Sequence, residues 1–172
     1  EEIADPAVPA RIASPLGRVV LEEVAFRYEP EKPLIDEFDL VVEPGSTVAI
    51  VGPTGAGKTT IVNLLMRFYE IDAGAILVDG IDIRDMTRDN LRRTFGMVLQ
   101  DAWLFKGTIR ENLTFVNPSA TDEEINEVLK KAACQNLLAR AENGLNTIIG
   151  EGGLKLSGGE RQRISIARAL LR

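Results

Sequence analysis

The sequence predicts an α/β fold, and three observations support this prediction. Residues 47–51 are a short apolar run that ends at a glycine-rich loop, and residues 60–68 follow the loop with apolar positions at helical spacing. Residues 18–42 alternate between apolar and polar side chains, as strands do. Residues 101–172 carry two helix start signals, which predict a mostly helical second part.

The first half of the chain is predicted in order as follows. Residues 1–17 contain three prolines, which favour an extended linker. The strands within residues 18–42 come next. Residues 47–51 are predicted to form a buried parallel strand, because the run is continuously apolar. The helix after the loop would pack on the sheet through Ile61, Leu64, Leu65 and Phe68.

Further elements follow the same logic. Residues 75–79 predict a short strand, and the pair Asp79-Gly80 is typical of a hairpin turn. Thr121 and Glu124 have the spacing of a capping box, which opens a helix with apolar residues Ile125, Val128, Leu129 and Ala132. The single cysteine, Cys134, lies among small apolar residues, so a core position is favoured over a reactive thiol.

Composition favours one soluble, intracellular domain. Hydrophobic residues make up 45% of the 172 residues, which suffices for a core, and no apolar run approaches the roughly 18 residues of a membrane helix. The net charge of −6 argues against a nucleic-acid partner. The basic cluster Arg161, Arg163 and Arg168 is therefore interpreted as a solvated helix face or as contacts within a dimer.

The glycine-rich loop matches G-x-x-x-x-G-K-[ST], a phosphate-binding motif. Glycines let successive N–H groups point at one anion, and the following helix adds its positive N-terminal end. Lys58 can reach the β- and γ-phosphates of a nucleotide, and the Thr59 hydroxyl can ligate Mg²⁺. The predicted binding residues here are Gly52, Pro53, Thr54, Gly55, Ala56, Gly57, Lys58, Thr59 and Thr60.

A second motif, at residues 156–163, opens another helix. Ser157 and Glu160 form a capping box, and Gly158 and Gly159 leave backbone N–H groups uncovered at the helix N-terminus. This arrangement predicts a second anion site made of Ser157, Gly158, Gly159 and Glu160. On its own, an ordinary capped helix start explains the motif equally well.

Together, the two motifs resemble the ATP-binding domain of an ABC transporter of the exporter type, the class that exports drugs and lipids. The resemblance extends over nearly all of residues 18–172. It implies a P-loop nucleoside triphosphatase (RecA-like) core with an N-terminal antiparallel β subdomain and a helical signature subdomain. It also implies a linker from a membrane domain at 1–17, a nucleotide-binding core at 18–100 and the helical subdomain at 101–172.

The resemblance assigns roles to particular residues. Tyr28 is similar in position to the family's aromatic residue under adenine, and Gln100 to its Q-loop glutamine. Lys58 and Gln100 are thus the expected catalytic residues, and Thr59 and Gln100 the expected metal ligands. Residues 107–113 resemble a segment of exporters, and residues 147–153 resemble the loop that touches the membrane domain.

Three features depart from the family pattern. Glu160 stands where the family more often has glutamine, and its charge would not help a nearby phosphate. The sequence stops before the strand that would carry the family's metal-binding aspartate and catalytic glutamate, and it contains no histidine for the family's switch position. We therefore expect a fold that is incomplete at its C-terminus and a chain that binds ATP but hydrolyses it poorly.

The resemblance implies ATP and Mg²⁺ as ligands, and a second nucleotide-binding domain and a transmembrane domain as partners. It places the protein at the cytoplasmic face of the cell membrane. Two alternatives stay open, namely a soluble ABC-type ATPase of repair or translation and a regulatory module that binds ATP without hydrolysis. Trp103 could be a core residue, or with Phe115 could form a groove for a membrane-domain coupling helix.

Overall fold

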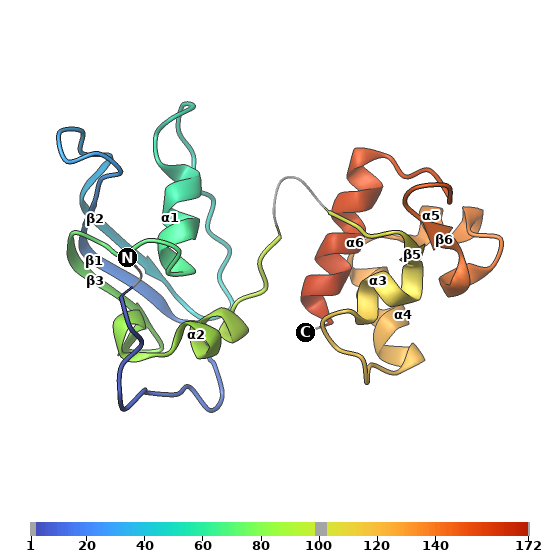
Figure 1. Ribbon diagram of the computed structural model, residues 1–172, viewed down its shortest axis with the longest axis horizontal. Coiled ribbons are helices and arrows are strands. Elements are labelled where there is room, and N and C mark those ends of the chain that lie inside the picture. The colour runs from blue at the N-terminus through green and yellow to red at the C-terminus, as the bar shows by residue number, and fades with distance from the viewer. Residues whose placement is uncertain (1–2, 99–102, 172) are drawn as a thin grey trace. The chain divides into compact units, whose positions relative to one another are not determined.

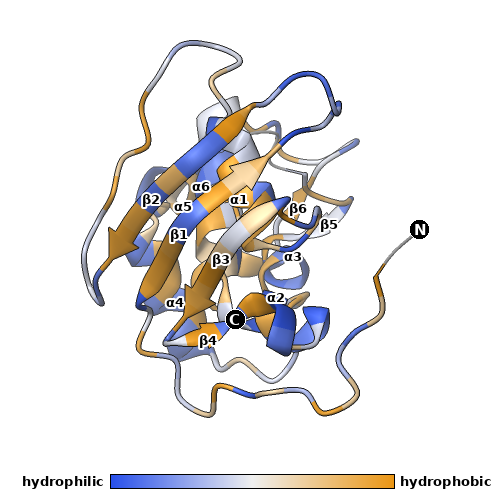
Figure 2. Cartoon of the chain, turned by 90° about the vertical axis from the view of Figure 1, so that its left-hand side faces the viewer, coloured by the Kyte–Doolittle hydropathy of each residue, from blue (hydrophilic) through white to orange (hydrophobic). Residues whose placement is uncertain are grey.

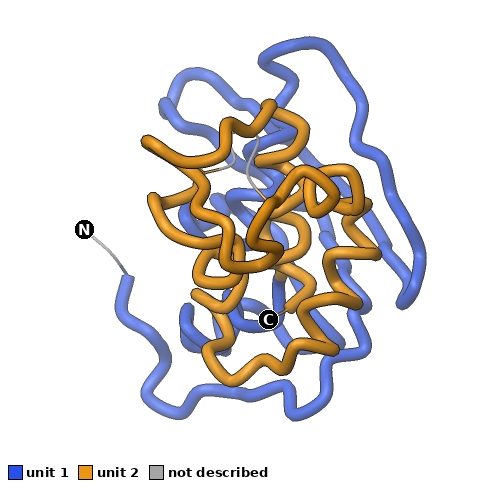
Figure 3. Tube along the Cα trace, turned by 90° about the vertical axis from the view of Figure 1, so that its right-hand side faces the viewer, with its two compact units in different colours: residues 1–95 blue, residues 96–172 orange. Residues whose placement is uncertain are grey.

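The computed structural model describes residues 3–98 and 103–171. The chain forms two compact units, Glu1–Phe95 and Gly96–Arg172 (Figure 3). The first contains a sheet and the second is mostly helical (Figure 1). Each unit has its own hydrophobic core, so each is described by itself. The predicted boundary between residues 100 and 101 falls outside the described residues.

The first unit is built on a four-stranded antiparallel sheet in the order β2-β1-β3-β4 (Figure 2). The strands are β1 (Val19–Phe26), β2 (Ile35–Val42), β3 (Ala73–Val78) and β4 (Ile81–Asp82). A bulge after Leu21 in β1 shifts the alternation, so that both Leu21 and Val24 are buried. The turn between β3 and β4 has positive φ at Asp79 and Gly80, which confirms the predicted hairpin.

Helix α1 (Lys58–Leu65) follows the glycine-rich loop and packs Ile61 and Leu64 into the core of the first unit. The prediction that this helix runs to Phe68 is wrong. Arg67 has a φ of +51°, and this left-handed conformation cannot continue an α-helix. Phe68 is exposed, and its ring centroid lies 4.8 Å from the guanidinium carbon of Arg92.

The prediction of a buried parallel strand over residues 47–51 is also wrong. Within the described parts of the chain these residues pair with no strand, and Val51 is 86% exposed. A strand needs a neighbour whose N–H and C=O groups face its own, which an apolar run cannot supply by itself. Beside this segment lies an apolar pocket of about 230 Å³, lined by Val19, Leu21, Leu40, Val42, Val48, Ile50, Ile61 and Leu65.

Residues 3–18, called the strap below, are irregular in structure but held to the first unit at several places, among them the following three. Asp5 contacts the start of α2 (Arg88–Thr94), where its carboxylate lies 2.9 Å from Arg88. The Ala10 N–H donates to the Asp85 carbonyl, at the end of the 3₁₀ helix η1 (Ile83–Asp85), over 2.8 Å. The carboxylate of Asp79 accepts backbone N–H groups from Leu16, Gly17 and Arg18.

An ion-pair network joins the strap to the end of α1. Arg67 is buried, and its guanidinium lies 2.8 Å from Glu70 and 3.8 Å from Asp5. Arg88 pairs with the same two carboxylates, each at 2.9 Å. Arg67 also donates to the Met86 carbonyl at 3.1 Å. Because each buried charge has an opposite partner, the network tolerates burial.

The second unit surrounds a core that includes Ile109, Leu129 and Ile164. Its elements are β5 (Gly107–Thr108), α3 (Ile109–Thr114), α4 (Asp122–Lys131), α5 (Gln135–Arg140), the 3₁₀ helix η2 (Gly144–Asn146), β6 (Ile148–Ile149) and α6 (Gly158–Leu170). The predicted capping box of Thr121 and Glu124 is present at α4. Cys134 is buried in this core, as predicted, and burial raises the pKa of its thiol.

Among residues 3–98 and 103–171, no helix has the length and apolar character needed to cross a membrane. The longest described helix, α6, has 13 residues.

Candidate functional site

The glycine-rich loop at residues 52–59 has a backbone that only glycine tolerates at two positions. Gly55 and Gly57 have φ values of +86° and +80°. A β-carbon at Gly57 would also contact Leu34 and Ile35 at 3.5 Å, whereas the space around Gly55 is open. Gly57 is thus required by its backbone conformation, since the 3.5 Å contacts are ordinary van der Waals distances, while the outer face of Gly55 leaves room for a ligand close to the backbone.

The start of α1 is an open anion site. Its N-cap residue is Gly57, which has no side chain to accept the first N–H groups, and the first turn contains no acidic residue. The orphan N–H groups and the helix dipole therefore favour a bound anion. Thr59 is exposed at the same helix end, where its hydroxyl can reach a metal ion.

Lys58 adds a full positive charge to this site. Its ammonium donates to the carbonyls of Gly52 at 2.9 Å and Pro53 at 2.7 Å, so it is folded back over the loop. An ammonium so placed can contact a phosphate held by the loop. Backbone N–H groups, an ammonium and a hydroxyl form the donor set that a nucleotide triphosphate with Mg²⁺ requires, and so the residues fit such a ligand.

Tyr28, the residue predicted to lie under adenine, is close to helix α1. Its hydroxyl is 3.2 Å from the hydroxyl of Thr60, which is buried on α1. Its ring meets the rings of Phe26 and Tyr69 edge-on, with centroids 4.8 and 5.1 Å apart. These contacts fix a half-exposed aromatic ring within reach of the phosphate-binding loop.

The second predicted anion site lies in the second unit, at the start of α6. The capping box is present: the Ser157 N–H donates to Glu160 at 2.8 Å, and the Glu160 N–H donates to the Ser157 hydroxyl at 3.2 Å. Gly158 and Gly159 are exposed and their N–H groups receive no side-chain cap. The helix end thus presents two uncapped N–H groups to solvent.

Glu160 is 8% exposed and also forms an ion pair with Arg140, at the end of α5. The pKa of Glu160 is lowered, chiefly because its carboxylate accepts the backbone N–H of Ser157, and also through the Ser157 hydroxyl and Arg140. The carboxylate is therefore ionised at neutral pH, and its charge is matched by a guanidinium.

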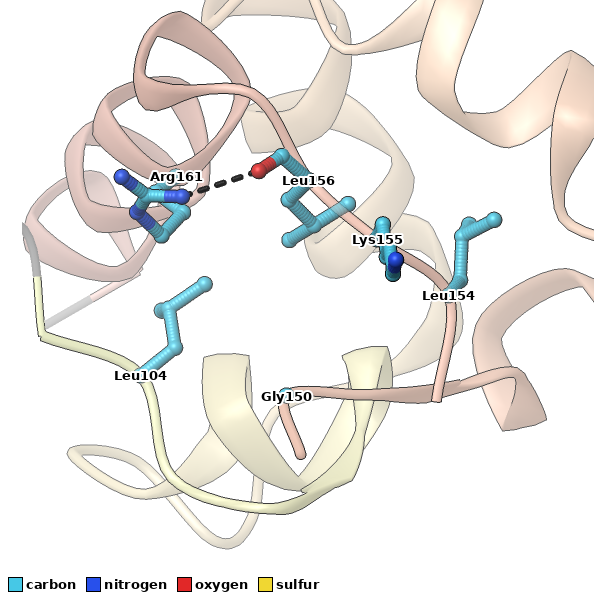
Figure 4. A pocket seen from close by; sticks show the side chains of 6 residues that line it. All are labelled: Leu104, Gly150, Leu154, Lys155, Leu156 and Arg161. Carbon is cyan, nitrogen blue, oxygen red and sulfur yellow. Dashed lines mark hydrogen bonds between the residues drawn. The ribbon is translucent and has the colours of Figure 1, made fainter. Parts of the chain in front are cut away.

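A pocket of about 320 Å³ opens beside the start of α6 (Figure 4). Its lining combines apolar side chains with two cations: Leu104, Gly150, Leu154, Lys155, Leu156 and Arg161. Arg161 donates to the Leu156 carbonyl at 2.8 Å. Arg168, which the sequence placed with it on a solvated or dimer-facing helix side, instead donates to the Asn112 carbonyl at 2.7 Å within its own unit.

A family model described as ABC transporter matches residues 35–172. The chain belongs to the ABC transporter family. This membership confirms the predicted P-loop fold class.

Similar ABC proteins include exporters of several kinds. The chain is 54% identical to a fatty acid ABC transporter ATP-binding/permease protein of Mycobacterium bovis, over 90% of this chain and 25% of that protein. It is 47% identical to a β-(1→2)glucan export ATP-binding/permease protein of Nitrobacter winogradskyi, over 91% and 26%. The chain thus spans about a quarter of the length of these relatives.

A solved structure of a bacterial Atm1-family ABC exporter with ATP bound has a similar fold. It is 43% identical, with a TM-score of 0.87, and the match covers 99% of this chain and 30% of that one. The comparisons give no support to a soluble ATPase of repair or translation.

The structure tests the prediction made for Trp103 but not the one made for Gln100. Trp103 is 68% exposed, which excludes the core position, and its ring contacts that of Phe105, which is partly buried and in turn contacts the exposed ring of Phe115. Gln100, the expected metal ligand and catalytic residue, lies outside the described residues.

Sequence reasoning missed two residues that contact predicted site residues, and one contact made by a predicted residue. Thr60 was predicted only as part of the loop, but its hydroxyl contacts Tyr28. Tyr69 and Arg140 were not predicted at all, although they contact Tyr28 and Glu160 respectively. No motif marks these residues, because their partners lie 41 and 20 positions away in the sequence.

Proposed function

We propose that the chain binds ATP with Mg²⁺ and that the complete protein, an ABC exporter, hydrolyses ATP to drive transport across a membrane. The observation that carries this proposal is the loop at 52–59, with left-handed Gly55 and Gly57 leading into the uncapped start of α1. That geometry gathers backbone donors, the Lys58 ammonium and the Thr59 hydroxyl at one point.

Each residue has a proposed task. The N–H groups of the loop hold the phosphates, and Lys58 contacts the β- and γ-phosphates. Thr59 ligates Mg²⁺, and Gln100 is the second proposed ligand by its resemblance to the Q-loop glutamine. When bound, the metal ion neutralises the charge that develops on the phosphates.

The start of α6 is proposed to act when two nucleotide-binding domains associate. We propose that residues 157–159 close on the nucleotide held by another nucleotide-binding domain, in a head-to-tail pair. Only the closed pair satisfies both anion sites, so a nucleotide triphosphate has higher affinity for the closed state. That difference in affinity is what would let ATP drive a conformational change.

The proposed partner in transport is a transmembrane domain, with this chain at the cytoplasmic face of the membrane. Two features support a docking surface in the second unit: the exposed rings of Trp103 and Phe115, which both contact Phe105, and the pocket lined by Leu104 and Leu156. The similar proteins named ATP-binding/permease combine both activities in one chain.

The test is equilibrium ATP binding and phosphate release by the full-length protein that contains this chain. We expect saturable binding that Mg²⁺ strengthens, and steady phosphate release. Saturable binding without any phosphate release would instead support the alternative of a regulatory module that does not hydrolyse ATP. No saturable binding would contradict the whole proposal.

A first prediction concerns Tyr28 as the adenine-stacking residue. Tyr28→Ala should weaken ATP binding by roughly 1–3 kcal/mol, the usual loss per stacked base. Tyr28→Trp should preserve affinity, because it keeps an aromatic face. Tyr28→Phe is the control that removes only the hydroxyl bonded to Thr60. If the alanine variant folds like the parent and binds ATP with the same affinity, Tyr28 does not stack on adenine.

A further inference from the structure

The carboxylate of Glu160 stands at the same helix end as the uncapped N–H groups of Gly158 and Gly159. It accepts the Ser157 N–H at 2.8 Å, which places the negative charge at the α6 N-terminus itself. Glu160 is buried, so water screens this charge poorly. Left alone, the carboxylate would cancel much of the positive field that makes the helix end an anion site.

Arg140 removes this conflict. Its guanidinium donates to the second carboxylate oxygen of Glu160, opposite the oxygen that serves the capping box. The Arg140 side chain is half exposed while that of Glu160 is nearly buried, so the arginine also bridges the carboxylate to solvent. The Arg140–Glu160 pair itself carries no net charge, so the negative charge of Glu160 is offset. Terminal nitrogens of Arg161 and Arg163 lie within 4 Å of where β-carbons on Gly158 and Gly159 would stand, so the side chains that remain at this helix end are cationic.

We propose that Arg140 is a positioning residue of the α6 anion site, which neutralises Glu160 so that this helix end can accept the phosphates of a nucleotide on a partner domain. The inference rests on the proposed head-to-tail pair. It adds a residue of α5, outside both sequence motifs, to the determinants of closure, and it explains how a glutamate can stand in this site without repelling its ligand.

If Arg140 had only a structural role, the expected results would differ from those of charge neutralisation. If Arg140 only fastens α5 to α6, its loss should lower the melting temperature, and removing the Glu160 charge should not repair closure. If Arg140 acts by charge, Arg140→Lys should retain closure, and Glu160→Gln should restore it in a variant without Arg140. Glutamine still completes the capping box, so Glu160→Gln changes charge with little change in the helix start.

The experiment measures association of the full-length protein by sedimentation, titrated with a slowly hydrolysed ATP analogue and Mg²⁺. Arg140→Gln should raise the analogue concentration for half-maximal association about tenfold, because the charge of Glu160 is then unpaired. The double variant Arg140→Gln with Glu160→Gln should associate like the parent. Arg110→Gln is the matched control, because it breaks an ion pair between Arg110 and Asp122 that does not involve α6.

Three outcomes decide between the ideas. Restored association in the double variant, with equal melting temperatures, supports neutralisation. Association by Arg140→Gln at the parent's analogue concentration, or no repair by Glu160→Gln, overturns it. A parent that binds the analogue but never associates would contradict the proposed pair itself, while the binding of the nucleotide is established separately by the equilibrium measurement on the full-length protein.

Discussion

Gly158→Asp is expected to abolish ATP-dependent association of two nucleotide-binding domains while each domain still binds ATP nearly as well as the parent. Gly158 is the first residue of α6 and is exposed, with its N–H uncapped. An aspartate there puts a carboxylate where a polyanion must approach the backbone, and like charges at such contact repel strongly.

The substitution should leave the second unit folded. Gly158 does not have a positive φ, and the nearest atom to an added β-carbon would be a terminal nitrogen of Arg161 at 3.8 Å. A carboxylate in the first turn also interacts favourably with the helix dipole, which stabilises the helix. The aspartate side chain should therefore leave the fold intact, although it should prevent a partner's nucleotide from binding at the start of α6.

Sedimentation with a slowly hydrolysed ATP analogue and Mg²⁺ measures the association. Ser119→Asp is the matched control, because it adds the same charge at an exposed position of the second unit, just before α4, and should associate like the parent. A Gly158→Asp protein that still associates at the parent's analogue concentration would exclude a cross-domain role for this helix end.

Lys58→Ala should weaken ATP binding by about 1.5–3 kcal/mol, which is roughly ten- to more than a hundredfold in affinity. The side chain is the one cation among residues 52–59, and its loss removes a charge-assisted contact to phosphate. Alanine suits the first turn of α1, so the helix should persist even though two bonds to loop carbonyls disappear.

Isothermal titration with ATP and Mg²⁺ measures this loss. Lys32→Ala is the control in the same unit, since Lys32 is exposed and pairs only locally, with Glu29. Equal ATP affinity in parent and Lys58→Ala, with equal melting temperatures, would show that the loop at 52–59 does not bind the phosphates.

Local signals explain what the sequence predicted well. The glycine loop, the Asp79-Gly80 turn and the capping box of Ser157 and Glu160 each depend on residues within a few positions of one another. Backbone conformation and short-range hydrogen bonds fix such features, so spacing alone identifies them.

The predictions that were wrong or incomplete concern features that depend on residues outside the local segment. Residues 47–51 are as apolar as a buried strand, but strand formation depends on a partner that the run itself does not contain. The end of α1 depends on Arg67, whose guanidinium is drawn to Glu70 and Met86. Arg140 and Glu160 meet only because α5 and α6 pack in one unit. None of these contacts leaves a periodic mark in the sequence.

The strap has a mechanical consequence. An unattached chain of 16 residues could extend to about 55 Å, so tension applied at its start would not be transmitted to the rest of the unit. This one is anchored at Asp5, so tension applied at Ile3 reaches Arg67 through an ion pair after two residues. Arg67 lies two residues beyond the end of α1, a helix only about 12 Å long whose other end is the glycine-rich loop. Tension on the N-terminal segment is therefore transmitted toward α1 and the glycine-rich loop at its other end.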